Sequence, residues 1–173
     1  MPLKLSLKPG EKFVLNGAVV LEVEHRDLGR AHLAAVMGEA VVLQQVLGDV
    51  DQMVARLRRR CPDDAGPLQR LRALNQFFFR DLGFGGNVNN YYDPDNSYLN
   101  AVLRTRRGIP ITLAVLWLEL AQGMGLKARG INFPGHFMVK VNLPNGQVVI
   151  DPFNGQSLSR DELAERLEPY KRR

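Results

Sequence analysis

The spacing of apolar residues changes near residue 25 and divides the chain into two parts. Before that point apolar and polar residues alternate, and Asn16-Gly17 separates two short apolar runs. Alternation is typical of a half-buried strand, and Asn-Gly between apolar runs is a strong hairpin signal. We therefore predict a β-hairpin-like segment over 1–24, followed by one domain over 25–173.

Helical spacing dominates the first half of the larger part. Apolar residues recur three and four positions apart over about 28–60 and 67–82, which predicts two amphipathic helices. A short third helix is predicted to end near Arg106, with Asn96 or Ser97 as its cap.

The stretch after Ile109, PITLAVLWLELAQ, is apolar on nearly every side. This pattern predicts a central helix that is buried all round, with Pro110 in its first turn. Three strand-like segments follow, at 128–133, 137–143 and 147–150. The order predicts an α+β fold, with a helical N-terminal half and a central buried helix packed on a small antiparallel sheet.

Composition narrows the class of protein. The 173 residues include a single cysteine, Cys61, so an internal disulfide and a multi-cysteine metal site are excluded. No apolar run reaches the roughly 18 residues of a membrane span, and the N-terminus lacks the apolar segment of a signal peptide. We expect a cytoplasmic protein without membrane contact and without a cofactor.

Charge gives only weak support for nucleic-acid binding. The formal net charge is +5, and three positive charges lie at the very end of the chain, in residues 171–173. Two further basic clusters lie at 56–60 and 104–107, and the first is on a predicted helix, where a solvated face is the ordinary interpretation. RNA binding is therefore a minor alternative.

The motif PGHF at 134–137 begins one predicted strand, and DPFNG at 151–155 follows another. With these motifs, with RRGIPITLAVLWLELAQ before them and with FFFRDLGFGGNVNNYYDPDNSYLNAVL upstream, residues 66–170 resemble the SirB-type transglutaminase-like family. The resemblance implies a papain-like core, in which a helix carrying a nucleophilic cysteine packs on a sheet carrying His and Asp. It places His136 and Asp151 at the His and Asp positions.

The chemistry of such a triad is well defined. A helix N-terminus lowers the pKa of a thiol, a neighbouring histidine accepts its proton and a carboxylate orients that histidine. In this chain the family's cysteine position corresponds to Pro110, which has no nucleophilic atom, and Cys61 lies outside the motif. Thr112 is a weak substitute nucleophile, although a threonine in a first helical turn ordinarily bonds to the backbone.

The predicted turn bears on whether the His–Asp pair can form. A two-residue turn at Asn145-Gly146 would place Asp151 opposite Lys140, roughly 13 Å along the strand from His136. Contact would then require a longer turn or a bulge. A metal held by His136 and Asp151 would lack ligands, unless Asp93 and a neighbouring carboxylate contributed, so we expect no metal site.

A polar, aromatic segment upstream of the central helix is the second candidate surface. It is predicted to line the cleft and bind a partner, and its candidate residues are Asn87, Asn89, Asn90, Tyr91, Tyr92 and Asp93. The alternative is that these side chains satisfy the backbone of a long loop.

Both ends of the chain add an expectation. Residues 1–20 resemble the start of the flagellar regulator FlbT, which is linked to flagellin messenger RNA. SirB-type relatives usually continue into a helical, tetratricopeptide-like segment, and we expect this domain to lack it. The resulting prediction is a non-catalytic module that binds or regulates a protein partner. The alternatives are a hydrolase or acyltransferase that uses His136 and Asp151 with a non-cysteine nucleophile, and an RNA-binding regulator.

Overall fold

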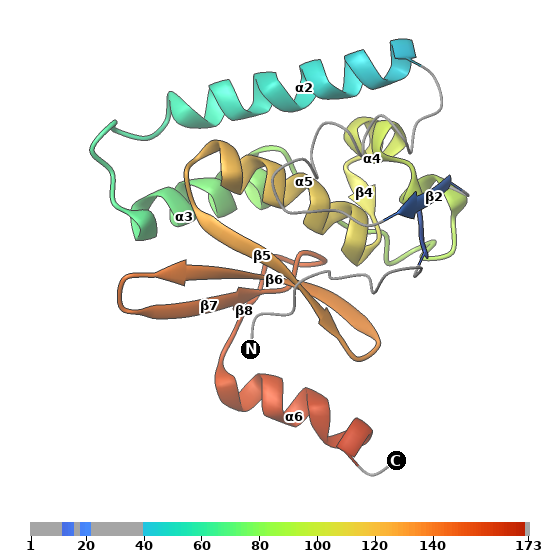
Figure 1. The fold of residues 1–173 in the computed structure, drawn as a ribbon, viewed down its shortest axis with the longest axis vertical. Helices are drawn as coiled ribbons and strands as arrows, with labels where there is room; N and C mark the ends of the chain where they lie inside the picture. The colour runs from blue at the N-terminus through green and yellow to red at the C-terminus, as the bar shows by residue number, and fades with distance from the viewer. Residues whose placement is uncertain (1–11, 16–17, 22–39, 172–173) are drawn as a thin grey trace.

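The computed structural model describes residues 12–15, 18–21 and 40–171, and their side chains from residue 45 onward (Figure 1). Near the N-terminus, β1 (Lys12–Leu15) and β2 (Ala18–Leu21) pair antiparallel, with Leu15 opposite Ala18. This pairing is the hairpin predicted around Asn16-Gly17. The other residues of the predicted segment 1–24, and the start of the helix predicted from residue 28, lie outside the described residues.

The helices follow the predicted order. They are α2 (Ala40–Arg58), α3 (Pro67–Asn75), the 3-10 turn η2 (Pro94–Ser97), α4 (Leu99–Thr105), α5 (Pro110–Gly123) and α6 (Arg160–Lys171). The helix predicted over 67–82 changes after Asn75 into the π-helical segment η1 (Gln76–Asp81). The predicted cap of α4 was wrong, because Tyr98 occupies that position. None of the helices in the described ranges is both long and apolar enough to cross a membrane.

The main sheet is small and antiparallel. Its strands are β5 (Lys127–Phe133), β6 (His136–Leu143), β7 (Gly146–Ile150) and β8 (Ser157–Leu158), adjacent in that order. A second, parallel ladder joins β3 (Gly85–Gly86) to β4 (Arg107–Gly108), directly before α5. The sequence pattern did not predict this ladder, because two glycine-containing dipeptides carry no strand periodicity.

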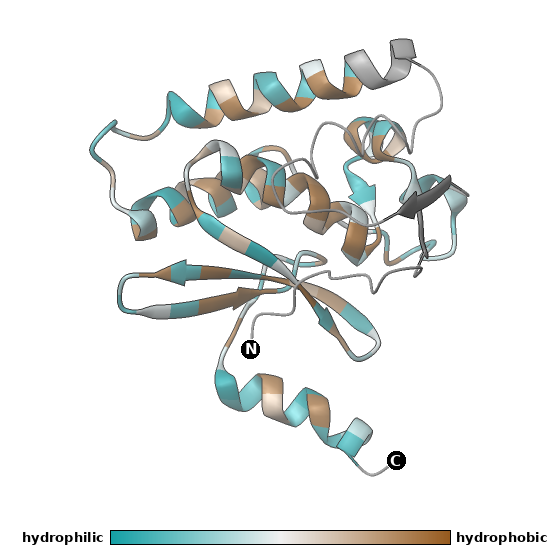
Figure 2. Cartoon of the chain, viewed as in Figure 1, coloured by the Kyte–Doolittle hydropathy of each residue, from teal (hydrophilic) through white to brown (hydrophobic). Residues whose placement is uncertain are grey.

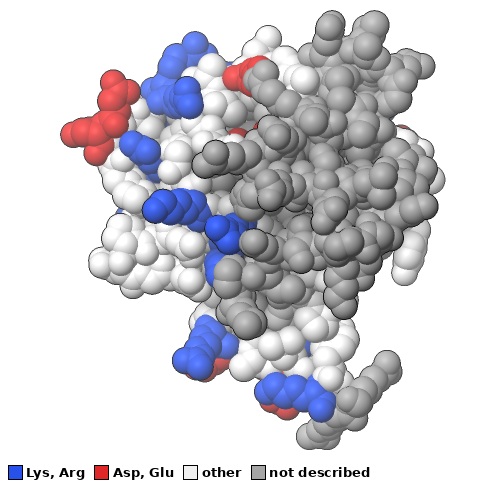
Figure 3. Space-filling model, viewed as in Figure 1, with Lys and Arg blue, Asp and Glu red and all other residues white. Residues whose placement is uncertain are grey.

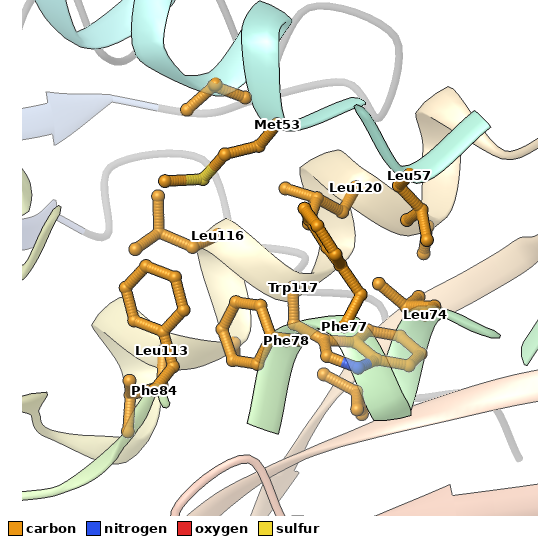
Figure 4. Close-up of a cluster of buried hydrophobic side chains, with 14 of the residues drawn as sticks. Met53, Leu57, Leu74, Phe77, Phe78, Phe84, Leu113, Leu116, Trp117 and Leu120 are labelled. Carbon is orange, nitrogen blue, oxygen red and sulfur yellow. The ribbon is translucent and has the colours of Figure 1, made fainter. Parts of the chain in front are cut away.

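Helix α5 forms the centre of the core. It lies between α2 and the sheet, and its side chains Leu113, Leu116 and Trp117 are almost completely buried (Figures 1 and 4). The indole Nε1 of Trp117 donates a hydrogen bond to Asn75 Oδ1 at 3.0 Å, so its polar atom is satisfied inside the core. Phe78 packs beside these residues and stacks on Phe84 with ring centroids 4.5 Å apart. The predicted central helix on a small antiparallel sheet is therefore present, but it is not buried all round, because Val115, Leu118 and Glu119 are only partly buried and Gln122 is exposed.

The sheet is covered on both faces near its middle. Val139 and Val141 belong to the core around α5, whereas Met138 packs with Leu163 and Leu167 of α6 on the other face. Helix α6 is otherwise largely polar (Figure 2). Alternate residues of β6 therefore belong to two apolar clusters, one on each face of the sheet. Neither face is fully open to solvent at this point.

Truncation of Phe78 tests the core. Phe78→Ala should lower the free energy of unfolding by about 3–5 kcal/mol, because it removes a buried ring and leaves a cavity. Urea denaturation followed by circular dichroism measures the change. Leu68→Ala, at a side chain that is 47% exposed, is the control and should change the same quantity by less than about 0.5 kcal/mol. Equal losses in the two variants would contradict this description of the core.

Candidate functional site

His136 and Asp151 are in direct contact. His136 is the first residue of β6, Asp151 directly follows β7, and His136 Nε2 donates to Asp151 Oδ1 at 2.7 Å. The separation of roughly 13 Å expected from the sequence was wrong because the turn lies one residue earlier, at Pro144-Asn145. Leu143 is opposite Gly146, which brings the end of β7 closer to the start of β6. Proline suits the second position of a four-residue turn and glycine the fourth.

Donors from three parts of the fold surround the Asp151 carboxylate, whose side chain is only 5% exposed. Besides the bond from His136, Oδ1 accepts the Phe153 N–H at 3.0 Å. Oδ2 accepts from Arg166 Nη1 of α6 at 3.2 Å. The backbone of the same segment closes a tight turn, in which Gly155 N–H donates to the Asp151 carbonyl at 2.8 Å with a φ of 77° at Gly155. This turn is the DPFNG motif.

These contacts set the charge of the pair. Burial raises the pKa of Asp151, but the hydrogen bonds from His136, from the Phe153 N–H and from Arg166 outweigh it, so the pKa lies below its ordinary value. The carboxylate is therefore ionised at neutral pH and orients the imidazole through Nε2. The His136 side chain is 23% exposed, and within the described residues its Nδ1 makes no hydrogen bond.

Phe153 forms one wall beside the histidine. Its ring meets the His136 ring edge-on, with centroids 6.4 Å apart, and Tyr91 lies at 6.0 Å on another side. Phe153 rests against Gly86 so closely that a Cβ at Gly86 would lie 2.1 Å from the ring carbons. Glycine is therefore required there for packing. Both residues belong to the motifs that carry the family resemblance, but no spacing in the sequence predicts their contact.

A continuous set of backbone bonds connects this wall with the start of α5. Gly86 N–H donates to the Phe153 carbonyl at 2.7 Å, and Asn87 N–H donates to the Gly108 carbonyl at 3.1 Å. Gly108 lies two residues before Pro110, the buried first residue of α5. The ladder β3–β4 thus connects the Asp151 turn to the helix end at which the family resemblance places the nucleophile.

The Thr112 hydroxyl forms hydrogen bonds with backbone groups. Its hydroxyl is fully buried, donates to the Asn96 carbonyl at 2.8 Å and accepts the Ile109 N–H at 3.2 Å. These bonds agree with the structural alternative for this residue, and they leave no exposed hydroxyl to attack a substrate.

The segment 87–96 is organised by Asn96, for which the sequence pattern indicated only the role of a helix cap. Asn96 is 2% exposed, and its Nδ2 donates to the carbonyls of Asn90 and Tyr91 at 2.8 and 3.0 Å. Its Oδ1 accepts from Asn87 Nδ2 at 3.0 Å, and Asp93 Oδ1 accepts a backbone N–H within the same loop. Asn87, Asn90 and Asp93 therefore bond chiefly within the loop.

The remaining candidates of that segment are exposed. Tyr92 is 91% and Tyr91 44% exposed, the two rings meet edge-on at 5.4 Å, and Asn89 is exposed as well. Tyr91 also contacts Phe153, whose ring meets that of His136. The rings of Tyr92, Tyr91 and Phe153 therefore form an aromatic row that ends at His136.

Cys61 and a metal site were also considered from the sequence. Cys61 is half-buried and packs against the core. Within the described ranges, no group of three or more His, Cys, Asp and Glu side chains gathers where it could hold a metal ion. His136 with Asp151 remains the only pair of these types that the described hydrogen bonds join in the segments 40–171.

Comparison with protein families matches residues 44–173 to the Transglutaminase-like superfamily. A UPF0162 protein of Xylella fastidiosa (strain 9a5c) is 46% identical over 102 residues, which cover 58% of this chain and 36% of that protein. A UPF0162 protein of Pasteurella multocida (strain Pm70) is 30% identical over 141 residues, covering 82% of this chain and 50% of that protein.

The chain thus spans half or less of these curated relatives. F-box only protein 21 of Homo sapiens is 39% identical over 72 residues, which are 42% of this chain and 12% of that protein. No solved structure matches the chain.

Because the pKa of Asp151 is lowered, the free energy of unfolding should depend on pH in the acidic range. The contribution of the ionised carboxylate is present above the unfolded-state pKa, about 3.9, and is lost as the pH falls through the folded-state pKa. Asp151→Asn should lower the free energy of unfolding by about 1–3 kcal/mol at pH 7, and the difference from wild type should shrink below about pH 4. Urea midpoints from pH 2.5 to 7 measure it. Asp64→Asn, on an exposed turn, should follow the wild-type curve, and a constant offset for Asp151→Asn would contradict the assignment.

The contact between Gly86 and Phe153 gives a second prediction. Gly86→Ala forces the Phe153 ring away and should cost about 1–3 kcal/mol of stability, as overpacking does. It should also shift the NMR signals of the His136 ring. Gly85→Ala is the matched control, because its Cβ would have ordinary contacts at 3.7 Å or more. The packing argument is wrong if the two variants behave alike.

Proposed function

Because the chain belongs to the Transglutaminase-like superfamily, we propose that it is a non-catalytic member that binds a protein partner at the surface around His136. One observation carries the proposal. The His136–Asp151 pair has a hydrogen bond of 2.7 Å and a partly exposed imidazole, yet neither Pro110 nor Thr112 offers a nucleophile beside it.

Several contacts favour binding over turnover. In the triad mechanism the imidazole accepts a proton from the nucleophile, and an oriented base without such a partner has no proton to accept at that position. The same imidazole can donate or accept one directed hydrogen bond to a bound chain. Asp151 holds the ring in one orientation, so this bond forms with little loss of side-chain entropy.

The aromatic row supplies the contact area. Tyr92 and Tyr91 are exposed next to Phe153, on a loop that Asn96 holds in shape. Exposed tyrosines on a rigid support are typical anchors of protein interfaces, because they bury a large area with few rotatable bonds. We therefore assign the row Tyr92–Tyr91–Phe153 and His136 to the partner surface.

The finer placement of the chain is part of the same proposal. The PGHF and DPFNG motifs support the SirB-type branch, and α5 against the antiparallel sheet supports a papain-like layout. A cytoplasmic location agrees with the single cysteine. The resemblance of residues 1–20 to FlbT stands on the sequence alone.

Site-specific photo-crosslinking tests the assignment. p-Benzoylphenylalanine in place of Tyr92 should give a discrete protein adduct in bacterial cells, and His136→Ala should weaken it several-fold. The same probe in place of Leu68, which is 47% exposed on α3, is the control and should give no such adduct.

Turnover is the outcome that would overturn the proposal. Purified wild-type protein should release no more product than buffer from glutamine-peptide, amide and ester substrates. A rate above buffer that falls in His136→Ala would instead show an enzyme with an unconventional nucleophile. Adducts of equal strength from both probe positions would contradict the assigned surface.

A further inference from the structure

An open groove of about 860 Å³ lies beside the Asp151 turn and shares Phe153 with the site described above. One wall is a single face of the α3–η1 helix, carrying Arg72, Asn75, Phe79 and Arg80. The rest of the lining consists of the glycine-rich segment 83–86, Val88, Arg107 and the end of the DPFNG turn. The groove is distinct from the His136 surface in its residues, apart from Phe153.

Positive charge lines this groove without a compensating acid. Its charged lining residues are Arg72, Arg80 and Arg107, and no Asp or Glu belongs to the lining in the described segments. Arg72 and Arg80 are exposed and form no ion pair with any described residue. Asp81, the neighbour of Arg80 in the chain, is already paired with Arg60 and accepts a bond from Gln76.

Arg107 is held in place as well as charged. Its Nη1 donates to the Gly83 carbonyl at 2.7 Å and to the Arg106 carbonyl at 3.0 Å. The guanidinium is thus fixed at the groove while its remaining N–H groups have no partner among the described residues. Such a preorganised fork loses little entropy when it binds a carboxylate.

The shape of the groove depends on close backbone packing. A Cβ at Gly155 would lie 2.8 Å from the Phe79 ring, so glycine lets the turn approach the helix wall. The π-helical segment has one wider turn, in which Leu82 N–H bonds to the Phe77 carbonyl. π-Helical segments are frequent at functional sites.

The aromatic residues of the groove do not form a stacking surface for nucleic-acid bases. Phe84 is 3% exposed, with Phe78 stacked at 4.5 Å on one face and the Arg106 guanidinium 4.7 Å from the ring centre on the other. Phe79 packs against Gly155, and Phe153 against Gly86. Sequence-tolerant binding of single strands relies on free ring faces, whereas each of these three rings is packed against another part of the protein.

We propose that the groove binds a carboxylate-rich segment of a protein partner. Three arginines supply the charge, and amide side chains and glycine backbone supply hydrogen-bonding groups for a peptide main chain. A volume of about 860 Å³ accommodates several residues, far more than a single small anion. This inference is independent of the role proposed for His136 and goes beyond it, since it concerns a different set of residues.

Binding of fluorescein-labelled hexaglutamate to the purified chain at 150 mM salt tests the proposal. Fluorescence anisotropy should show saturable binding, and amide NMR signals of Gly83, Gly85 and Gly155 should shift. The variant with both Arg72→Gln and Arg80→Gln should bind at least about tenfold more weakly, because two charge-assisted hydrogen-bonding groups are lost.

The control must carry the same change in charge, because Lys and Arg side chains also spread over other parts of the surface (Figure 3). Arg59→Gln with Arg104→Gln fits, since both side chains are exposed and lie outside the groove lining. This double variant should bind hexaglutamate within about twofold of wild type, because it keeps all three groove arginines. Circular dichroism melting of both double variants confirms that each is folded.

Four results with hexaglutamate and its controls would overturn the proposal, and a fifth result, with RNA, would replace it. They are no saturable binding of hexaglutamate, equal weakening in the two double variants, equal binding of hexaglutamine, and displacement by millimolar inorganic phosphate alone, which would indicate a small-anion site. Tighter binding of hexauridylate than of hexaglutamate would assign the groove to RNA. Since no arm of this experiment alters His136, failure here leaves the proposed partner surface untouched.

Discussion

A buried carboxylate must be surrounded by donors, and Asp151 imposes that condition on the C-terminal half of this domain. Taking an ionised group out of water is costly unless hydrogen bonds replace the lost hydration. The required donors come from β6 through His136, from the following turn through Phe153 N–H and from α6 through Arg166. One charged group therefore fixes a strand start, a turn and a peripheral helix relative to one another.

The N-terminal half of the domain contacts the Asp151 turn through side-chain packing. Gly86 allows the Phe153 ring to pack closely against β3, and the β3–β4 ladder connects this contact to the first turn of α5. The first residue of α5, Pro110, and most of its apolar side chains are buried, so this end of the helix cannot shift without disturbing the core (Figure 4). The His–Asp pair is thus held between a rigid helix and a sheet, which is the arrangement expected of a site that needs exact geometry.

Periodicity was sufficient for the order of helices and strands and for the burial of α5, because both follow from apolar spacing. Periodicity did not predict the features that depend on one or two residues. The Pro144-Asn145 turn changed the strand register and joined His136 to Asp151, and the π-helical segment after Asn75 has the same apolar spacing as an α-helix. The roles of Arg166 and Asn96 depend on contacts far apart in the chain or inside a loop, for which no local signal exists.

The β3–β4 ladder also closes the segment between its two strands, in which the loop 87–96 precedes α4. The ladder fixes the start of that loop, buried Leu99 and Val102 of α4 anchor the chain beyond its end, and Asn96 ties the loop together, so its exposed tip makes few demands on the core. Substitutions at Tyr91 and Tyr92 can therefore accumulate during evolution without loss of the fold. A domain built in this way can change what it recognises while its scaffold stays the same.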